Sequence, residues 1–463
     1  MLNAVTRQYI EGCLNPGSRL RSVATELELP GAFAKSYGQV QLDRPLFVPA
    51  KEISSFAADL AALFDLLVSL PARVFDGDLR RYCGAIGIED PMAELMCRGV
   101  GDVRPPLYAR ADAYHDGTGF RLLELNVGSE LGGIDTAQVN RAYLKVPAFA
   151  EFARLHRLGH VDTLPRLVAR LRRVAESVTT EEPVIGLIES NGGLVAHDHV
   201  FLAIQEAMSA LGVRLLLGEL HELGERNGKL TLRDVPLDVV LRYFVSGELV
   251  DDPAGQETLD TVIRAHEAGR TALFTPLAGG AFASKASLAL LHEPVVRTAL
   301  SSEQRAVIDR VVPWTRLLSA PPQLAGPESG GDRVELIDRC RADRENLVLK
   351  PGVGYGGVGA VIGHEVTDEQ WQRALSDPTA NDYVVQQRVR PATESVVNAA
   401  TGVVEEWVAN WGIFVDPEGY AGGFVRALKP TDGAVVSYSN PGTRGTCVFT
   451  FPNELPHPDN FAR

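Results

Sequence analysis

Cysteine is scarce in this sequence and follows no metal-binding or disulfide pattern. The 463 residues contain 5 cysteines, an odd number, and none of them forms a CxxC pair. A structural zinc site or a disulfide framework needs closely spaced or paired cysteines. The scattered thiols therefore argue against both, and they favour a protein of the reducing cytoplasm.

Long apolar runs and an excess of basic residues are also missing. No apolar run approaches the roughly 18–20 residues that a membrane-spanning helix needs, and residues 1–20 lack the apolar core and cleavage site of a signal peptide. The formal net charge is −14, whereas phosphate backbones recruit basic surfaces. We therefore expect a cytoplasmic protein that binds neither a membrane nor nucleic acid, although a few local basic groups could still bind a nucleotide.

The length and the order of the patterns predict an α/β protein of several domains. A chain of 463 residues is too long for one ordinary core, so two or three packed domains are expected. FAADLAALFDLLVSL (56–70) has the apolar spacing of a helix and is expected to end at Pro71. The predicted segments are a mostly helical region at 1–105, two strands and a helix at 106–160, alternating strands and helices at 161–270, and a mixed region at 271–463.

The third segment has the pattern of a small parallel sheet. PVIGLIES (183–190), VRLLLGEL (213–220) and LDVVLRYF (237–244) are continuous apolar strands, and a helix at 199–212 separates the first two. Buried strands in strand–helix–strand order predict a doubly wound sheet. IESNGG lacks the GxGxxG fingerprint, which argues against a sugar-nucleotide or dinucleotide enzyme but leaves it as an alternative.

Two neighbouring strands carry the first candidate site. A turn at 116–119 joins a strand with Arg110 and Asp112 to a strand with Glu124 and Asn126. Alternation places each pair on one face, so the faces coincide if the strands pair. Carboxylate and amide oxygens with an incomplete shell suit Mg²⁺. A solvated hairpin face would have the same pattern, but apolar neighbours bury the strand around Glu124, and a buried carboxylate needs a partner.

A lysine followed by glycines forms the second candidate site. Lys350 ends a strand in NLVLKPGVGYGGVGAVIG, and the chain returns into another strand instead of opening a helix. Glycines let backbone amides approach phosphates, while an ammonium supplies positive charge. This is neither a P-loop nor a Rossmann turn. An ordinary Gly-rich hairpin with a surface lysine is the alternative.

A third group of polar residues lies near the C-terminus. Arg426, Lys429, Asn440 and Arg444 stand in or beside Gly-containing strands and loops. Cations around a phosphoryl group stabilise charge as it moves to the leaving group. Charge balance in an acidic protein explains Lys429 and Arg444 equally well.

The set of motifs resembles the circularly permuted ATP-grasp ligases related to glutathionylspermidine synthetase. In that family an R-x-D strand precedes an E-x-N strand at the spacing found from Asp112 to Glu124, and both precede the lysine strand. The resemblance implies ATP and Mg²⁺ as cofactors, with the metal on Asp112, Glu124 and Asn126. It also implies that Arg110 orients the acidic substrate or the phosphoryl group, and that Arg426 contacts the transferred phosphoryl group.

The resemblance further implies a nucleotide site in the second half of the chain. The family usually has a second lysine about 35 residues before the loop lysine, a spacing carried over from the resemblance, where this chain has Arg316. An arginine can serve as a fixed cation, and Lys285 is the rival. The remaining implied nucleotide contacts are Lys350 with the loop glycines Gly354, Gly356 and Gly357, and Gln386, Gln387 and Val389 near the base.

The expected function is therefore an ADP-forming ligase that joins a carboxylate to an amine through an acyl-phosphate. The expected fold is a permuted ATP-grasp core formed by 106–160 and 271–463, with a Rossmann-like domain at 161–270 and a helical region at 1–105. The partners would be small-molecule or peptide carboxylates and amines, and a homodimer is one assembly that stays open. Plausible substrate contacts are Asn191, His197, Arg242 and the loop 128–133. A nucleotide-binding scaffold without turnover is the main alternative.

Overall fold

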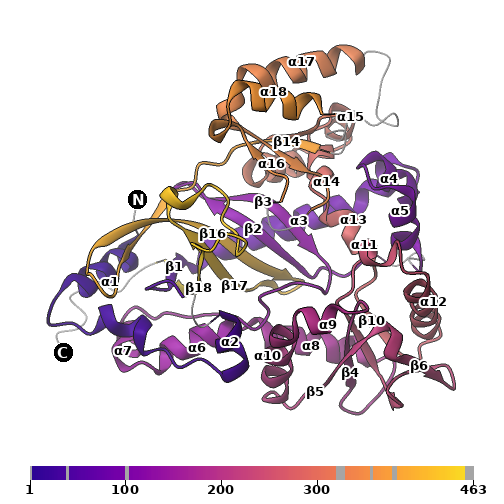
Figure 1. Cartoon of the computed structure of the whole chain (residues 1–463), viewed down its shortest axis with the longest axis horizontal. Helices are drawn as coiled ribbons and strands as arrows, with labels where there is room; N and C mark the ends of the chain where they lie inside the picture. Colours follow the sequence, from indigo (N-terminus) through magenta and orange to yellow (C-terminus); the bar gives the residue numbers. More distant parts are fainter. Residues whose placement is uncertain are drawn as a thin grey trace.

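The computed structural model of the chain is a mixed α/β protein with several β-sheets that are covered by helices (Figure 1). Four sheets occur among the residues that the structure describes. These residues are 3–37, 41–99, 104–319, 329–354, 358–377 and 383–453.

The largest sheet lies in the middle of the molecule and draws its strands from distant parts of the chain. Its order is β1-β18-β17-β16-β2-β3, and β15 pairs with β16. All pairs are antiparallel except β1 with β18. The predicted hairpin of β2 and β3 is confirmed. The bounds are β1 (Leu46–Pro49), β2 (Ala109–His115), β3 (Phe120–Val127), β15 (Thr393–Val397), β16 (Val404–Asp416), β17 (Gly419–Leu428) and β18 (Arg444–Phe451).

The β2–β3 hairpin contains a bulge that simple alternation did not predict. Asp112 pairs with Glu124, but the next residue, Ala113, pairs with Leu122. Leu123 is thus an extra residue on β3, and such an insertion redirects the neighbouring side chains. The bulge decides which side chains of β3 share a face with Glu124.

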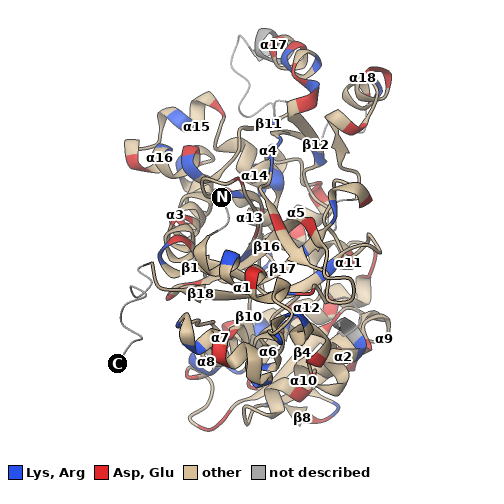
Figure 2. Cartoon of the chain, turned by 90° about the vertical axis from the view of Figure 1, so that its left-hand side faces the viewer, with Lys and Arg blue, Asp and Glu red and all other residues tan. Residues whose placement is uncertain are grey.

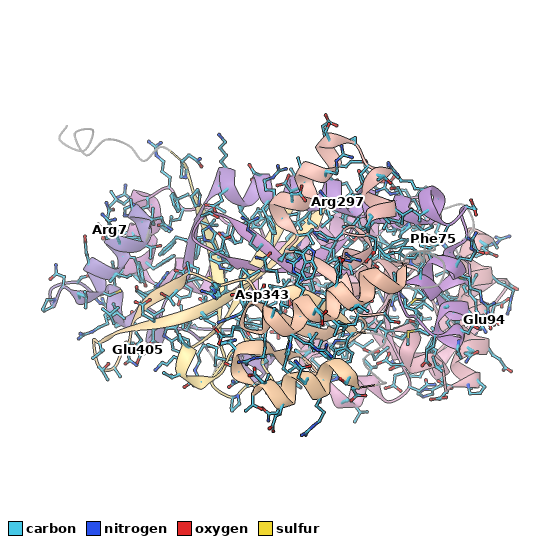
Figure 3. The ribbon with its side chains drawn as sticks, turned by 90° about the horizontal axis from the view of Figure 1, so that it is seen from above. Arg7, Phe75, Glu94, Arg297, Asp343 and Glu405 are labelled. Carbon is cyan, nitrogen blue, oxygen red and sulfur yellow. The ribbon has the colours of Figure 1, made fainter. Side chains whose placement is uncertain are left out.

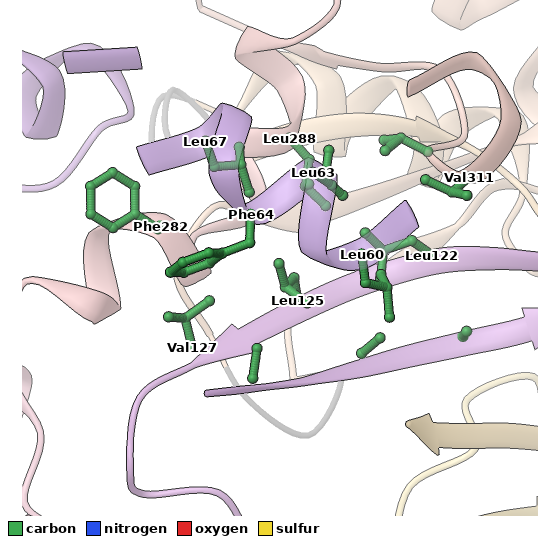
Figure 4. Packing of buried hydrophobic residues seen from close by; sticks show 14 of the residues in the cluster. Leu60, Leu63, Phe64, Leu67, Leu122, Leu125, Val127, Phe282, Leu288 and Val311 are labelled. Carbon is green, nitrogen blue, oxygen red and sulfur yellow. The ribbon is translucent and has the colours of Figure 1, made fainter. Parts of the chain in front are cut away.

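Helix α3 (Ala50–Val74) packs against this central sheet. Its Leu60, Leu63 and Phe64 belong to the same buried cluster as Leu122 and Leu125 of β3 (Figure 4). The expected end at Pro71 was wrong, because Pro71 lies inside the last turn and the helix continues to Val74. Pro71 removes only the one intrahelical bond that an N–H at this position would donate four residues back, and the helix continues to Val74.

Helix α3 also differs from the expectation that no segment approaches membrane-spanning length. The helix has 25 residues and a mean hydropathy of 1.7 in its most apolar window, so by length and composition it could cross a bilayer. Half of that window is buried inside the protein, and a core helix passes the same test. The apolar stretch at 56–70 is extended at both ends by the helix that contains it.

The predicted parallel sheet is confirmed and has one more strand than expected. Its order is β10-β9-β4-β5, and all three pairs are parallel. Its strands are β4 (Val184–Glu189), β5 (Arg214–Glu219), β9 (Val239–Arg242) and β10 (Ala272–Phe274), with helices α8 (Thr163–Ala175), α9 (Gly193–Ala196), α10 (Asp198–Ser209), α11 (Ser246–Leu249) and α12 (Pro253–Glu267). A small antiparallel sheet follows β5 and consists of β6 (Leu223–Arg226), β7 (Lys229–Leu232) and β8 (Val235–Pro236).

The sheet that contains Lys350 forms a separate layer, at the top of Figure 1. Its order is β11-β14-β12-β13, all antiparallel, and Trp371 of α18 is buried in the cluster on one of its faces. Figure 2 shows acidic and basic residues interspersed along α16 and α17 near this layer. The elements are β11 (Thr315–Leu317), β12 (Leu347–Pro351), β13 (Val361–Ile362), β14 (Tyr383–Gln387), α13 (Gly279–Ala283), α14 (Lys285–Leu290), α15 (Pro294–Thr298), α16 (Ser302–Val311), α17 (Ser329–Ala342) and α18 (Asp368–Ser376).

The remaining helices lie at the two ends of the molecule and around its lower edge. Seen from above, Arg7 of α1 lies at the same end as Glu405 of β16, and Phe75 and Glu94 lie at the other (Figure 3). These helices are α1 (Ala4–Leu14), α2 (Gly31–Tyr37), α4 (Leu79–Ala85), α5 (Asp90–Cys97), α6 (Ala137–Lys145) and α7 (Pro147–Leu155). Short 3₁₀ helices occur at Leu20–Glu26, Leu220–Glu222, Arg344–Asn346, Gly363–Glu365 and Pro430–Asp432. Because β1 joins β18, residues before 105 contribute to the central sheet, and the proposed domain limits stay a prediction.

We predict that truncating Leu63 destabilises the protein strongly. Leu63 lies on α3 and is fully buried in the cluster that this helix shares with β3. Leu63→Ala should therefore lower the free energy of unfolding by about 2–5 kcal/mol. Urea denaturation measures the change. Val195 is 84% exposed, and Val195→Ala serves as the control, with an expected change within about 0.5 kcal/mol. Equal effects of the two variants would contradict the assignment of α3 to the core.

Candidate active site

A cavity of about 390 Å³ is lined by residues of both the central sheet and the Lys350 sheet. The central sheet contributes side chains from β2, β3, β16 and β17, and the other sheet contributes β12, β13 and β14. The structure therefore brings the two predicted halves of the site together. The predicted residues in the lining are Arg110, Asp112, Glu124, Asn126, Lys350, Gly354, Gln386, Gln387, Val389 and Arg426.

Strand pairing explains how the central sheet presents its polar groups. Asp112 stands opposite Glu124, and Arg110 stands opposite Asn126. Residues that are directly opposite share a face, and so do alternate residues of one strand. The bulge adds Leu123 to the same wall, beside Glu124. One face thus holds two carboxylates, an amide, a guanidinium and an apolar side chain.

Asp112 is held by two arginines. Its carboxylate accepts from Arg110 Nε at 3.1 Å and from Arg426 Nη2 at 2.5 Å. Asp112 is only 3% exposed. Burial by itself would raise the pKa of this carboxyl, but the guanidinium groups of Arg426 and Arg110 more than offset it and hold the pKa well below the ordinary value. Asp112 therefore stays ionised and fixes both arginines.

Glu124 is connected to the opposite wall of the cavity by Lys285. The ammonium lies 2.9 Å from Glu124 Oε2 and donates to the carbonyl oxygen of Gly354 at 2.8 Å. The backbone also joins the two parts, because Lys285 N and Ser284 Oγ both donate to the oxygen of Gly352. Ser284 caps α14, which begins at Lys285. Lys285 therefore lies between Glu124, a candidate metal ligand, and the glycine loop that contains Gly354.

Lys350 is positioned by a short chain of hydrogen bonds. Its ammonium donates to Gln386 Oε1 at 2.6 Å, and Gln386 Nε2 donates to Thr315 Oγ1 at 3.1 Å. The pKa of Lys350 is lowered to about 8, mainly by desolvation and also by the charge of Lys285, while Glu124 and Asp112 oppose the shift. Lys350 is thus a cation below about pH 8 that can respond to a bound anion.

The structure does not bring Arg316 into the site. Arg316 forms an ion pair with Glu293, at 2.8 Å from Nε to Oε1, and among the described lining residues Lys285 is present while Arg316 is absent. The cause is strand alternation: Thr315 pairs with Gln386, so the next residue, Arg316, points to the other face of the sheet. Of the two rivals, Lys285 lines the cavity and Arg316 does not.

The other predicted nucleotide contacts lie along the same wall. Gln387 and Val389 follow Gln386 at the end of β14, and the backbone N–H of Gln387 donates to the oxygen of Trp314 at 2.7 Å. Gly354 lines the cavity. Gly356 and Gly357 lie outside the described residues.

Most of the C-terminal group lies outside the cavity. Lys429 forms an ion pair with Glu405 at 3.0 Å, and Arg444 donates to nearby backbone oxygens. Of the predicted group, Arg426 lines the cavity. Sequence reasoning missed Asn410, which lines the cavity opposite Arg426 in the β16–β17 pairing. Its place between Trp407 and Trp411 carried no signal of its own.

Arg242, one of the plausible substrate contacts, supports the loop 128–133. Arg242 is 1% exposed and donates to Glu130 Oε2 at 2.6 Å and to the oxygen of Thr275. On the other side, Arg110 Nη1 donates to the oxygen of Gly132 at 2.8 Å. The loop is therefore held between the parallel sheet and the central sheet. Asn191 instead bonds Asp252.

The donor set of the central sheet fits Mg²⁺ better than a transition metal. Within the described residues no group of three or more His, Cys, Asp or Glu side chains could hold a metal ion. Asn126 donates through Nδ2 to the oxygen of Arg110, which leaves its amide oxygen for a ligand beside Glu124. A few hard oxygen donors next to phosphate-binding cations are the environment in which Mg²⁺ binds.

Comparison with known proteins identifies the fold. No family model and no curated protein matches the sequence. Among solved structures, a glutathione synthetase-like effector from Globodera pallida, solved in its apo form, matches with a TM-score of 0.57 and 12% identity over 96% of this chain and 97% of that one. The chain shares the fold of this glutathione synthetase-like protein. A proposed gamma-glutamylcysteine synthetase from Methylobacillus flagellatus KT matches with a TM-score of 0.42 and 13% identity over 87% of this chain and 89% of that one.

We predict that the affinity of the cavity for an anionic ligand such as tripolyphosphate falls as pH rises through about 8, because Lys350 loses its charge there. The sign follows from the lowered pKa: the ammonium is present below it and is lost above it. Isothermal titration calorimetry with tripolyphosphate between pH 6.5 and 9.5 measures the effect. In Lys350→Arg the group stays charged, so the decline should disappear. A decline of the same size in both proteins would assign it to another group.

Proposed function

We propose that this protein is an ATP- and Mg²⁺-dependent ligase that joins a carboxylate to an amine through an acyl-phosphate and releases ADP and phosphate. The observation that carries the proposal is the cavity that gathers Asp112, Glu124 and Asn126 on one wall and Lys285 and Lys350 on the other. Oxygen donors for a hard cation thus face ammonium groups suited to a triphosphate. The permuted ATP-grasp assignment belongs to this proposal and is supported by the shared fold.

Glu124, Asn126 and Asp112 would hold the metal. When bound there, Mg²⁺ would neutralise phosphate charge and complete its shell with phosphate oxygens. Glu124 is partnered by Lys285 at 2.9 Å, so a cation on Glu124 leaves the ammonium of Lys285 available for a phosphate oxygen. Asp112 keeps Arg110 and Arg426 beside it and contributes negative charge to the same wall.

The cations of the chain stabilise charge in the first chemical step. A substrate carboxylate oxygen attacks the γ-phosphorus of ATP, the bond to the β–γ bridging oxygen breaks, and ADP leaves. Arg110 and Arg426 donate to the phosphoryl oxygens, and Lys285 and Lys350 neutralise the charge that moves to ADP. Because Asp112 fixes both arginines beforehand, little reorganisation is needed during the step.

The second step forms the amide. The amine nitrogen attacks the acyl carbon, phosphate leaves with the bonding electrons, and the amine loses a proton. The protein needs no nucleophile of its own in either step. The loop 128–133, held by Arg242 and Arg110, borders the arginines and is the part of the chain that we expect beside the acceptor. Exclusion of water here protects the acyl-phosphate.

The base of ATP would lie at the end of β14. Gln386, Gln387 and Val389 line the cavity, and its lining also includes the apolar Leu123 and Ile362 from opposite walls. Apolar side chains in such a cavity suit a flat ring. Gln386 would contact the base while it holds Lys350, which couples base recognition to phosphate binding.

A catalytically weak scaffold on the same fold is the second candidate. Both carboxylates of the donor set already have cationic partners, and the matching structure is described as an effector. The other argument for a scaffold is the apparent replacement of a lysine by Arg316, and the presence of Lys285 in the cavity lining weakens it. The ligase proposal implies that the partners are small-molecule or peptide carboxylates and amines, and it gives no role to nucleic acid or a membrane. A cytoplasmic location and a homodimer stay predictions.

We predict that phosphate release from ATP depends on both a carboxylate and an amine. The purified protein is incubated with MgATP and with pooled carboxylates and amines, and mass spectrometry detects adducts that have lost one water. Glu124→Gln should lower kcat at least about 10²-fold, because loss of a metal ligand costs several kcal/mol of charge stabilisation.

Glu405→Gln is the matched control for this experiment. Glu405 pairs with Lys429 at 3.0 Å, its side chain is 22% exposed like that of Glu124, and it lies outside the cavity lining. We expect normal turnover in this variant. Equal background hydrolysis in the wild type and Glu124→Gln, without dependence on an acceptor, would favour the scaffold. Tight NAD binding without ATP binding would instead revive the Rossmann-type enzyme.

A further inference from the structure

Phe424 lies against both arginines that hold Asp112. The centroid of its ring is 5.5 Å from Cζ of Arg110 and 5.7 Å from Cζ of Arg426. Guanidinium groups within about 6 Å of an aromatic centroid are attracted by the negative face of the ring. Phe424 is 6% exposed, so little water competes with this contact. One ring thus supports two cations that come from different strands.

Two glycines make room for the ring. A Cβ atom at Gly412 would come within 2.8 Å of the ring of Phe424, and one at Gly133 within 2.5 Å. Gly412 of β16 pairs with Phe424 of β17 on one side and with Asp112 of β2 on the other. It therefore lies between the ring and the carboxylate in one row across the sheet. Any larger residue at either position would displace the ring.

Asp112 holds both arginines by charge and hydrogen bonds, and the ring adds a restraint on how the guanidinium planes are tilted. Arg426 donates through Nη2 to Asp112, but within the described part of the chain its buried Nε has no hydrogen-bond partner. A single charge-assisted bond places one nitrogen and restricts the tilt of the guanidinium plane less, whereas a ring face restricts that plane directly. Arg110 has a second bond, to the oxygen of Gly132. The ring therefore matters most for Arg426.

Packing in an apolar core is the ordinary role of a buried phenylalanine. Phe424 does belong to a buried cluster, where its ring lies 6.3 Å from that of Phe414. Phe414 is fully buried in the same cluster, and among the described residues no cation–π contact involves it. The pair separates the two roles, because both rings pack and Phe424 alone of the two supports guanidinium groups.

We propose that Phe424 is a positioning residue, whose ring holds the guanidinium groups of Arg110 and Arg426 in the orientation that stabilises the transferred phosphoryl group. Its effect on turnover rests on the proposed function. Preorganised donors stabilise a transition state without reorganisation during the reaction. The ring thus acts through the arginines, and Phe424 is not among the described residues that line the cavity.

The test replaces Phe424 with 4-fluorophenylalanine and with 3,4,5-trifluorophenylalanine by stop-codon suppression. Fluorine weakens the negative face of the ring in steps and leaves its shape nearly unchanged. We expect kcat and the ratio of MgATP to MgADP affinity to fall stepwise, by about fivefold for the trifluoro ring. The melting temperature should stay at the wild-type value. Affinities that are independent of fluorination would overturn the proposal.

The same substitutions at Phe414 are the control, and they should leave kcat and the affinity ratio unchanged. A crystal structure of Phe424→Leu gives a readout that needs no turnover. We expect the guanidinium groups of Arg110 and Arg426 to adopt new or several conformations, and unchanged guanidinium positions would also overturn the proposal. If the wild type binds nucleotides but forms no adduct, the ligase function fails, while the affinity ratio still decides the role of Phe424.

Discussion

Asp112 accepts from two guanidinium groups whose residues are far apart in the chain, and the cavity wall depends on this contact. Arg110 stands two residues before Asp112 on β2, and Arg426 reaches it from β17, across β16. At 3% exposure, an unpaired carboxylate would be costly, and so would arginines deprived of their partner. The three charges therefore hold one another. The phosphoryl-binding cations that we propose are fixed by the fold before any ligand arrives.

The opposite wall of the cavity is joined to this one through Lys285. Its ammonium bridges Glu124 and the oxygen of Gly354, and its backbone N–H donates to Gly352. Lys350 is held separately, by Gln386 on the neighbouring strand. Hydrogen bonds and ion pairs of this kind can exchange partners when a phosphate group and a metal ion bind, whereas packed apolar side chains cannot. The arrangement suits the function that we propose, in which the site opens for ATP and closes again around a reactive intermediate.

Local pattern was a good guide where a feature depends on neighbouring residues. The sequence predicts the hairpin of β2 and β3, the lysine strand with its return strand β13, and the parallel sheet of β4, β5 and β9, and the structure contains all three. Local sequence pattern did not predict the features that depend on contacts between distant parts of the chain. Arg316 occupies a strand of three residues, too short to show which face would turn to the cavity. The bulge at Leu123 likewise depends on pairing between strands, which alternation along one strand does not reveal.

The amino-acid sequence by itself determined the α/β class, the order of the polar motifs along the chain, and the kind of ligand that oxygen donors and cations could bind. These properties follow from residue chemistry and from the periodicity of local segments. The tertiary structure alone decided that Lys285 and not Arg316 lines the cavity, that Asp112 is shared by two arginines, and that Phe424 supports both. Each of these depends on which strands become neighbours, and strand pairing is set by the burial of the whole core.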